Sequence, residues 1–356
     1  MPVVFTAVVF LLMVPGSPAL AAATGDAVLP AESTSTADDP DFELQGEFLD
    51  SSVRDGKPAI GLQVVARGKG EFLGVLYEGG LPGAGWNRVF RRELHGTRHG
   101  ESVELRTGDA DPLRVVVRSV SADLYTGQQT RQLQRCVRVS PSMGLSPPAG
   151  ARVYFQDSQP RDLAGAAMFD DGYLRPGART SNSVRDFQLH LEFRTPFMPE
   201  ARGQARGNSG VYIQERYEVQ ILDSFGLPLA NNECGALYRQ QPPDLNICLP
   251  PGQWQTYDIT FRAARFDSQG NKICPARVTV LHNGQPIHCD RMLPTKTGAG
   301  KPEGAELRPI LFQDHGNPVA FANIWLVDLA DDPLRDSRPR FLERLRLRRA
   351  VRGRTG

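Results

Sequence analysis

The chain has 356 residues, of which 41 are Lys or Arg and 40 are Asp or Glu, and its formal net charge is +1. Residues 335–356 hold nine Arg against Asp336 and Glu343, a balance of +7, so the remainder of the chain carries −6. A mildly acidic body lacks the clustered positive charge that nucleic-acid binding requires, and this argues against that class of function.

Residues 3–13 are apolar apart from Thr6, and an Ala-rich stretch follows at 19–23. This pattern predicts a signal peptide over residues 1–23, which is too short for an ordinary transmembrane helix. We therefore expect an exported mature chain (periplasmic, extracellular or at the cell surface) with no membrane-spanning segment. Polar residues at 24–41 predict a flexible leader, and the Arg-rich tail at 334–356 is expected to be solvated rather than membrane-bound.

Five cysteines in a chain expected to be exported predict disulfide bonds with one thiol left over. Cys234 and Cys248 flank one loop rich in Gln and Pro, so we expect them to form a bridge. Cys136, Cys274 and Cys289 have no assigned partner. A zinc site is the competing interpretation, which the absence of any CxxC motif disfavours.

Residues 42–139 predict a small β-rich accessory domain, because short apolar runs alternate there with glycine-rich turns. One short helix is expected over Leu124–Leu133, although Gly127 interrupts it. The Ser- and Pro-rich composition of residues 140–152 predicts a linker. The strands expected in the accessory domain are Ile60–Val65, Phe72–Tyr77, Ser102–Leu105, Leu113–Val117 and Cys136–Val139.

A second β-rich domain is expected over residues 153–333. Its clearest strand is 186–194, where four apolar residues alternate with Gln188, His190, Glu192 and Arg194, which predicts one buried and one solvated face. Many such antiparallel strands, without intervening helix patterns, predict an all-β fold with two packed sheets of a jelly-roll sandwich. The further strands expected here are 234–238, 254–263, 276–282, 287–289, 310–313 and 322–327.

The stretch 207–224 carries the candidate chemistry. Two apolar runs alternate in it and predict a hairpin, and burying the apolar face of the second run sends Glu218 and Gln220 together to the other face. Asp223 joins them only if the strand ends or bulges near Leu222. Carboxylates beside an amide suit the recognition of sugar hydroxyl groups, which need fixed donors and acceptors. A merely solvated strand face is the alternative.

Several motifs of this second domain resemble those of the 3-keto-disaccharide hydrolase domain family, which has a concanavalin-A-like sandwich fold. The resemblance has two departures, since many members have Gly where Glu215 stands and Arg where Ala322 stands. It covers most of residues 153–330 in the family's order. The matching segments are Asp186–Arg194, Arg206–Tyr212, Tyr217–Ser224, Gly252–Asp258, Leu311–Gly316 and Asn323–Trp325.

The resemblance implies a glycoside-cleaving enzyme that acts on 3-keto-glycosides or 3-keto-disaccharides. A ketone at C3 acidifies the C2 hydrogen, so a base removes it, the C1 substituent leaves and water adds to the double bond. The implied catalytic residues are Glu218, Asp223 and His315, with either Glu218 or His315 as the base. The implied substrate contacts are Asn208, Gln220, Tyr238, Gln313 and Asn323.

Three alternatives stay open at this point. One is an ordinary glycosidase that uses Glu218 and Asp223 as its two carboxylates. The others are a non-catalytic, lectin-like carbohydrate-binding sandwich and a cell-surface adhesion module. No cofactor is predicted, although Asp223 and Asp314 leave a divalent metal ion open. The expected partner is a carbohydrate, and the sequence leaves the oligomeric state undetermined.

Overall fold

The computed structural model describes residues 39–50, 59–108 and 112–329. The signal peptide expected over 1–23, most of the leader at 24–41 and the tail at 334–356 lie outside the described residues. Within the described ranges the chain is almost entirely β-strand, and one short 3-10 helix, Gly203–Ala205, is its only named helix. None of the helical structure in these ranges is long and apolar enough to cross a bilayer.

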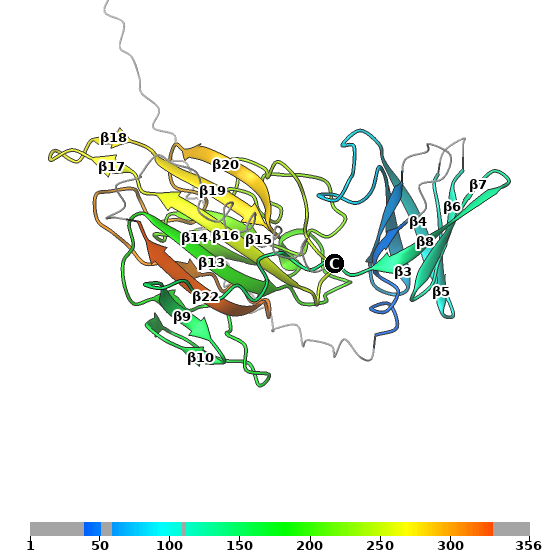
Figure 1. The fold of residues 1–356 in the computed structure, drawn as a ribbon, viewed down its shortest axis with the longest axis horizontal. Helices are drawn as coiled ribbons and strands as arrows, with labels where there is room; N and C mark the ends of the chain where they lie inside the picture. The colour runs from blue at the N-terminus through cyan, green and yellow to red at the C-terminus, as the bar shows by residue number, and fades with distance from the viewer. Residues whose placement is uncertain (1–38, 51–58, 109–111, 330–356) are drawn as a thin grey trace, which may run out of the picture. The chain divides into compact units, whose positions relative to one another are not determined.

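The first eight strands form a closed antiparallel barrel in which each strand pairs with its neighbours in sequence and β1 pairs with β8 (Figure 1). Glycine permits one close approach: a Cβ on Gly96 would lie 1.7 Å from the Glu104 carbonyl oxygen of the next strand. The strands are β1 (Gly46–Leu49), β2 (Ile60–Ala66), β3 (Glu71–Glu78), β4 (Arg91–His99), β5 (Ser102–Arg106), β6 (Arg114–Val117), β7 (Ser121–Thr126) and β8 (Gln129–Cys136).

The prediction of a helix over Leu124–Leu133 is wrong. β7 and β8 form a hairpin there, with Thr126 paired to Gln129. Gly127, which interrupts the helical pattern, has a φ of 59° in the two-residue turn, where a glycine is favoured. The last strand of the barrel therefore ends at Cys136, and the strand expected over 136–139 lies largely beyond it.

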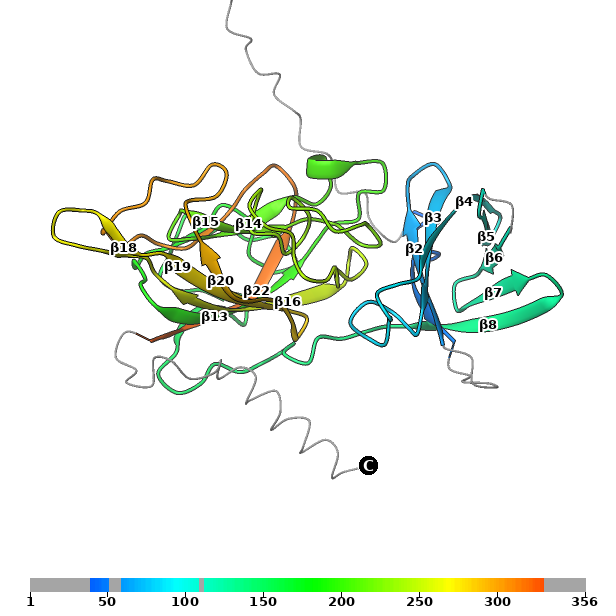
Figure 2. The same cartoon turned by 90° about the horizontal axis from the view of Figure 1, so that it is seen from above.

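Residues from β9 onward form two antiparallel sheets, as an all-β sandwich predicts (Figure 2). The seven-stranded sheet has the order β10-β9-β22-β13-β16-β19-β20, and the five-stranded sheet has the order β11-β12-β21-β14-β15. A two-stranded sheet joins β17 (Arg265–Phe266) and β18 (Lys272–Cys274). The other strands are β9 (Arg152–Gln156), β10 (Gln159–Pro160), β11 (Leu163–Ala164), β12 (Arg179–Thr180), β13 (Phe187–Arg194), β14 (Ser209–Ile213), β15 (Tyr217–Ile221), β16 (Trp254–Arg262), β19 (Ala276–His282), β20 (Gln285–Leu293), β21 (Leu311–Phe312) and β22 (Ala320–Asp328).

The core lies between the two sheets. The apolar residues of β13 that alternate with polar ones belong to it, together with Tyr217, Val219 and Ile221 of β15. Because strand side chains alternate between faces, Glu218 and Gln220 point away from this core, on the outer face of the five-stranded sheet. That face is nevertheless enclosed, because all five residues of β15 are buried.

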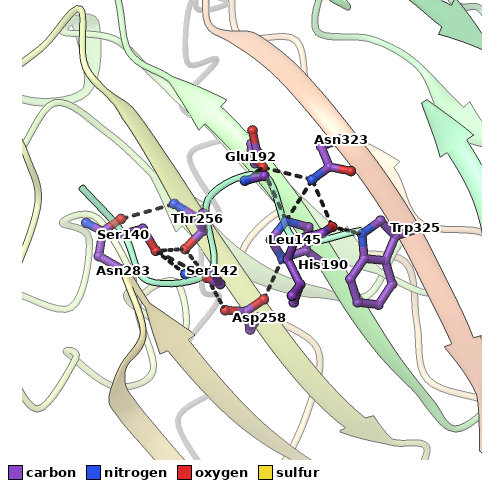
Figure 3. A network of polar contacts seen from close by, with 11 residues as sticks. Ser140, Ser142, Leu145, His190, Glu192, Thr256, Asp258, Asn283, Asn323 and Trp325 are labelled. Atoms are coloured by element: carbon purple, nitrogen blue, oxygen red, sulfur yellow. Dashed lines mark hydrogen bonds and ion pairs between the residues drawn. The ribbon is translucent and has the colours of Figure 1, made fainter. Parts of the chain in front are cut away.

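The outer face of β13 was expected to be solvated, but it is buried. Gln188, His190 and Glu192 are buried there, and residues 140–146 pack over the part of this face that holds Glu192 and the His190 partner Asp258. This segment, which its composition predicts as a linker, is held to the sheet by side-chain and backbone hydrogen bonds (Figure 3). Two of its three serines, Ser140 and Ser142, are themselves buried.

Candidate active site

The β14–β15 hairpin brings the candidate polar residues together. In its register Tyr212 is paired with Glu218, and Gly210 is paired with Gln220. Two-residue periodicity then puts all four on the outer face of the five-stranded sheet. Tyr212 was not among the residues selected from the sequence, although its spacing of two from Gly210 indicates this face.

The three-residue turn of this hairpin contains the first departure from the family pattern. Gln214 and Glu215 have φ values of 52° and 51°, in the left-handed region that glycine adopts most easily. Glu215 is held there by contacts of its own. Its carboxylate accepts a hydrogen bond from Arg308 Nη1 at 3.2 Å, and its carbonyl accepts one from Lys301 N at 2.8 Å.

A loop encloses Glu218 from the other side. The backbone N–H of Glu218 donates to Thr297 Oγ1 at 2.7 Å, and its carbonyl accepts from Tyr238 N at 3.2 Å. A Cβ on Gly298 would lie 2.8 Å from the Tyr238 ring and 3.6 Å from Glu218 Oε2. The loop can approach the carboxylate this closely because residue 298 has no side chain. The sequence carries no periodic signal that would have found Thr297 or Gly298.

Burial controls the charge of Glu218. The residue is only 2% exposed, and its desolvation raises the pKa of its carboxyl from an ordinary 4.5 to about 7, although a hydrogen bond from Tyr212 opposes this. The pKa of the Tyr212 hydroxyl is raised far above its usual range, by burial first and then by the neighbouring carboxylate. Glu218 therefore exchanges a proton near neutral pH, as a general base must.

Hydrogen-bond acceptors outnumber donors around Glu218. Its Oε2 and the Oε1 of Gln313 are both buried without a hydrogen-bond partner. A Cβ on Gly210 would lie 2.6 Å from Glu218 Oε1 and 3.1 Å from Gln313 Oε1, so the two side chains approach the same point. Buried acceptors of this kind are costly unless a ligand or water supplies donors.

Gln220 adds to this excess. One end of its amide lies 3.0 Å from Glu218 Oε1 and 2.9 Å from the Ser209 carbonyl. The other end lies 3.0 Å from Gln204 Oε1 and 3.3 Å from Asn208 Oδ1. An amide has one donor end, so whichever way it is oriented one pair of acceptors is left without a donor from it. A ligand rich in hydroxyl groups would satisfy such a site.

Asn208 is fixed beside Gln220. Its backbone N–H donates to Asn317 Oδ1 at 2.7 Å, and its Nδ2 donates to the Gln204 carbonyl at 2.7 Å. Tyr238 lies next to Gly298, and the Arg239 guanidinium stands 5.5 Å from the centre of its ring. Asn208 thus lies beside Gln220, and Tyr238 lies beside Glu218 across Gly298.

His315 lies on an exposed loop at the edge of this cluster. The loop is anchored on both sides of it, since Gln313 N donates to the Gly210 carbonyl at 2.8 Å and Asn317 accepts from Asn208. The His315 side chain is exposed and makes no hydrogen bond to the described residues. The structure therefore puts it at the rim, beside the cluster rather than within it.

Asp223 does not join Glu218. β15 ends at Ile221, and Asp223 is buried in an ion pair with Arg206, whose Nε lies 2.6 Å from Oδ2. The carboxylate of Asp223 is thus neutralised by Arg206, which disfavours the mechanism in which Glu218 and Asp223 form the two-carboxylate pair of a glycosidase.

Asn323 and Ala322 lie elsewhere in the sandwich. Both belong to β22, on the outer face of the seven-stranded sheet, where Asn323 Nδ2 donates to Glu192 Oε1 at 2.8 Å. The core separates them from Glu218. The second departure from the family pattern therefore does not affect the surroundings of Glu218.

The expected bridge between Cys234 and Cys248 is not formed, and all five cysteines are free thiols. The two buried thiols hydrogen-bond to each other instead, which raises the pKa of Cys248. Cys234 also contacts the Tyr257 hydroxyl, 3.2 Å away. In the described ranges no group of three or more His, Cys, Asp or Glu side chains is arranged to hold a metal ion.

Comparison with known proteins agrees with these motifs. The family model of the 3-keto-alpha-glucoside-1,2-lyase-like domain matches residues 165–327. A solved "putative glycosyl hydrolase" from Parabacteroides distasonis ATCC 8503 is 30% identical, with 52% of this chain and 86% of that chain covered and a TM-score of 0.48. A second protein of the same description and organism is 20% identical, with 50% and 99% covered and a TM-score of 0.36. No curated protein matches the chain. From the family match, and from the identity over most of the first solved protein, we conclude that the chain belongs to the family of 3-keto-alpha-glucoside-1,2-lyase-like domains.

Proposed function

We propose that this protein is an exported enzyme that cleaves 3-keto-glycosides at the site around Glu218. Family membership and the descriptions of the solved relatives support a glycoside hydrolase. The observation that carries the proposal is the pair of buried, unpartnered acceptors, Glu218 Oε2 and Gln313 Oε1, beside a carboxyl group whose pKa is about 7. Sugar hydroxyls supply the donors that these acceptors lack.

Glu218 acts as the general base in this proposal. Its carboxylate takes the C2 proton of the substrate, and the electrons of the C–H bond form an enolate with the C3 carbonyl. When the carbonyl re-forms, a C1–C2 double bond forms, the bond from C1 to the glycosidic oxygen breaks and the leaving alcohol takes a proton. Water then adds to C1 and a proton returns to C2, so the net reaction is hydrolysis.

The surrounding residues orient the substrate and stabilise the enolate. The Gln220 amide stands beside Glu218 and the Asn208 amide stands beside Gln220, and both would donate to the developing oxyanion. Tyr238 would bound the sugar, and His315, on the exposed rim, would protonate the leaving alcohol. The ketone is essential, because without it the C2 hydrogen is far too weakly acidic for a carboxylate to remove.

Deuterium exchange tests this mechanism. The protein is incubated in D2O with a 3-keto-disaccharide and, separately, with its unoxidised parent sugar. We expect cleavage of the 3-keto sugar alone, with deuterium at C2 of the product, and a fall of about 10²- to 10⁴-fold in kcat/KM for Glu218→Gln. In the unsubstituted enzyme, kcat/KM should rise with pH through about 7, because Glu218 must be ionised to act.

Three results would overturn the proposal. Equal cleavage of the unoxidised sugar without deuterium would replace the mechanism with an ordinary glycosidase mechanism. Binding of both sugars without cleavage of either would identify a lectin. Full activity of Glu218→Gln, with loss of activity in His315→Ala, would transfer the role of base to His315.

A further inference from the structure

The seven-stranded sheet has a cavity of its own, of about 330 Å³, on its outer face. This volume lies at the lower end of the range for small-molecule sites. Glu192, Asn323 and Ala322 of the sheet line it, together with Tyr173 and with Leu145 of the packed segment. The core separates this cavity from Glu218, because the two lie on the outer faces of opposite sheets.

Two fixed acceptors face the cavity. Glu192 uses Oε1 to accept from Gly144 N at 2.7 Å and from Asn323 Nδ2 at 2.8 Å, so its Oε2 stays available. Asn323 uses Nδ2 for all its bonds to the described residues, including one to the Leu145 carbonyl at 3.2 Å, so its Oδ1 also stays available. Figure 3 shows both side chains held side by side in this network.

A buried network of His190, Asp258 and Glu192 keeps the Glu192 carboxylate charged. His190 is fully buried, with Nδ1 2.6 Å from Asp258 Oδ1 and Nε2 3.6 Å from Glu192 Oε1. Burial alone would lower the pKa of His190, but the two carboxylates outweigh it and raise the pKa to about 9. Burial likewise opposes the charge on Glu192, yet hydrogen bonds from His190, Asn323 and Gly144 hold its pKa below the ordinary value. Glu192 is therefore an ionised, preorganised acceptor.

An aromatic wall completes the cavity. The Tyr173 ring is centred 4.6 Å from the Trp254 ring, and the Arg194 guanidinium stands 5.1 Å from the centres of both. Arg194 is fixed in turn by an ion pair with Asp171 at 2.9 Å. A tyrosine ring braced in this way offers an apolar surface for the C–H face of a pyranose.

We propose that this cavity is a second carbohydrate-binding site, which takes a neutral pyranose residue through two of its hydroxyl groups. The hydroxyls donate to Glu192 Oε2 and Asn323 Oδ1, and the sugar ring packs on Tyr173. An anionic sugar is disfavoured by the Glu192 carboxylate and by Asp157, which also lines the cavity. A metal ion is disfavoured because no three metal-binding side chains gather in the described ranges. The proposal does not depend on catalysis at Glu218.

Calorimetric titration of the full chain with the neutral disaccharides trehalose, maltose and cellobiose tests this site. Two variants alter it: Tyr173→Ala removes the platform, and Ala322→Arg fills the cavity and pairs with Glu192. The matched control is Tyr125→Ala in the barrel, whose ring also carries an arginine, Arg114, 4.7 Å from its centre. A second control is Glu218→Gln. Glucuronic acid is the anionic comparison ligand.

At least one neutral disaccharide should bind, and both cavity variants should weaken it by about ten-fold or more. Tyr125→Ala and Glu218→Gln should keep this binding. If Ala322→Arg does not fold, the affinity of Tyr173→Ala for the disaccharide tests the proposal alone. The proposal is overturned if no neutral disaccharide binds, if glucuronic acid binds more tightly, or if binding is lost in Glu218→Gln and retained in Tyr173→Ala. That last result would assign all binding to the Glu218 site and leave the proposed function standing.

Discussion

Glu218→Gln should make the protein more stable at alkaline pH. The carboxyl has a pKa of about 7 in the folded chain against an ordinary 4.5, because its charged form is desolvated. A carboxyl with a raised pKa favours folding while it is protonated. Its contribution is therefore complete below pH 4.5, falls as the pH rises from about 4.5 to about 7, and is lost above that range.

The size of the effect follows from the shift. At 1.36 kcal/mol per pKa unit, ionising Glu218 in the fold costs about 3 kcal/mol of unfolding free energy. Glutamine has nearly the same shape and does not ionise. The variant should therefore match the parent near pH 4.5 and exceed its unfolding free energy by up to about 3 kcal/mol at pH 8.

Urea unfolding at pH 5 and pH 8, followed by tryptophan fluorescence, measures this difference. Subtracting the parent from the variant cancels the other titrating groups, and Glu101→Gln, at an exposed position, is the matched control. If the parent and Glu218→Gln change in parallel between the two pH values, the carboxyl is not desolvated and the argument for it as a base near neutrality fails.

Three further predictions concern the surroundings of the site. Gly210→Ala should lower kcat/KM by ten-fold or more while the protein stays folded, because its Cβ would lie 2.6 Å from Glu218 Oε1; unchanged kinetics would contradict that packing. Glu215→Gly should change the unfolding free energy by less than about 1 kcal/mol, because relief at a φ of 51° offsets the lost ion pair; a larger loss in urea unfolding would assign the turn to that ion pair. Cys234 and Cys248 are buried free thiols, so alkylation of the unfolded protein without reduction should label both; one linked species in a non-reduced peptide map would contradict this.

The hairpin that carries Glu218 was predictable because each of its strands has strict two-residue alternation. The same alternation in β13 located the core correctly, but it could not show that residues 140–146 cover the opposite face. That covering depends on tertiary hydrogen bonds, for which Ser and Pro composition carries no signal. The helix predicted in place of the β7–β8 hairpin is also explained by a tertiary contact. β8 pairs with β1, which is distant in sequence, and this pairing outweighs the local helical pattern.

The position of Asn323 could not be predicted because the strand is irregular. Phe321 and Ile324 both belong to the core, whereas the two residues between them, Ala322 and Asn323, both line the cavity. Asn323 has a φ of 44°, and the register shifts opposite it, between His190 and Glu192 of β13. Such a bulge redirects side chains without leaving a trace in the hydrophobic pattern.

The packing of residues 140–146 bears on where a truncated form of this chain could begin. Ser142 Oγ donates to the fully buried Asp258 at 2.7 Å, and the Leu145 carbonyl accepts from Trp325 Nε1 at 3.0 Å. A truncated protein that began at residue 165, where the family match starts, would expose that carboxylate and indole and would also lose β9, an inner strand of its sheet. Each lost buried hydrogen bond costs about 1 to 3 kcal/mol, comparable with the whole stability margin of a small domain. We therefore expect a truncated protein to need the residues from Ser140 onward in order to fold as the sandwich.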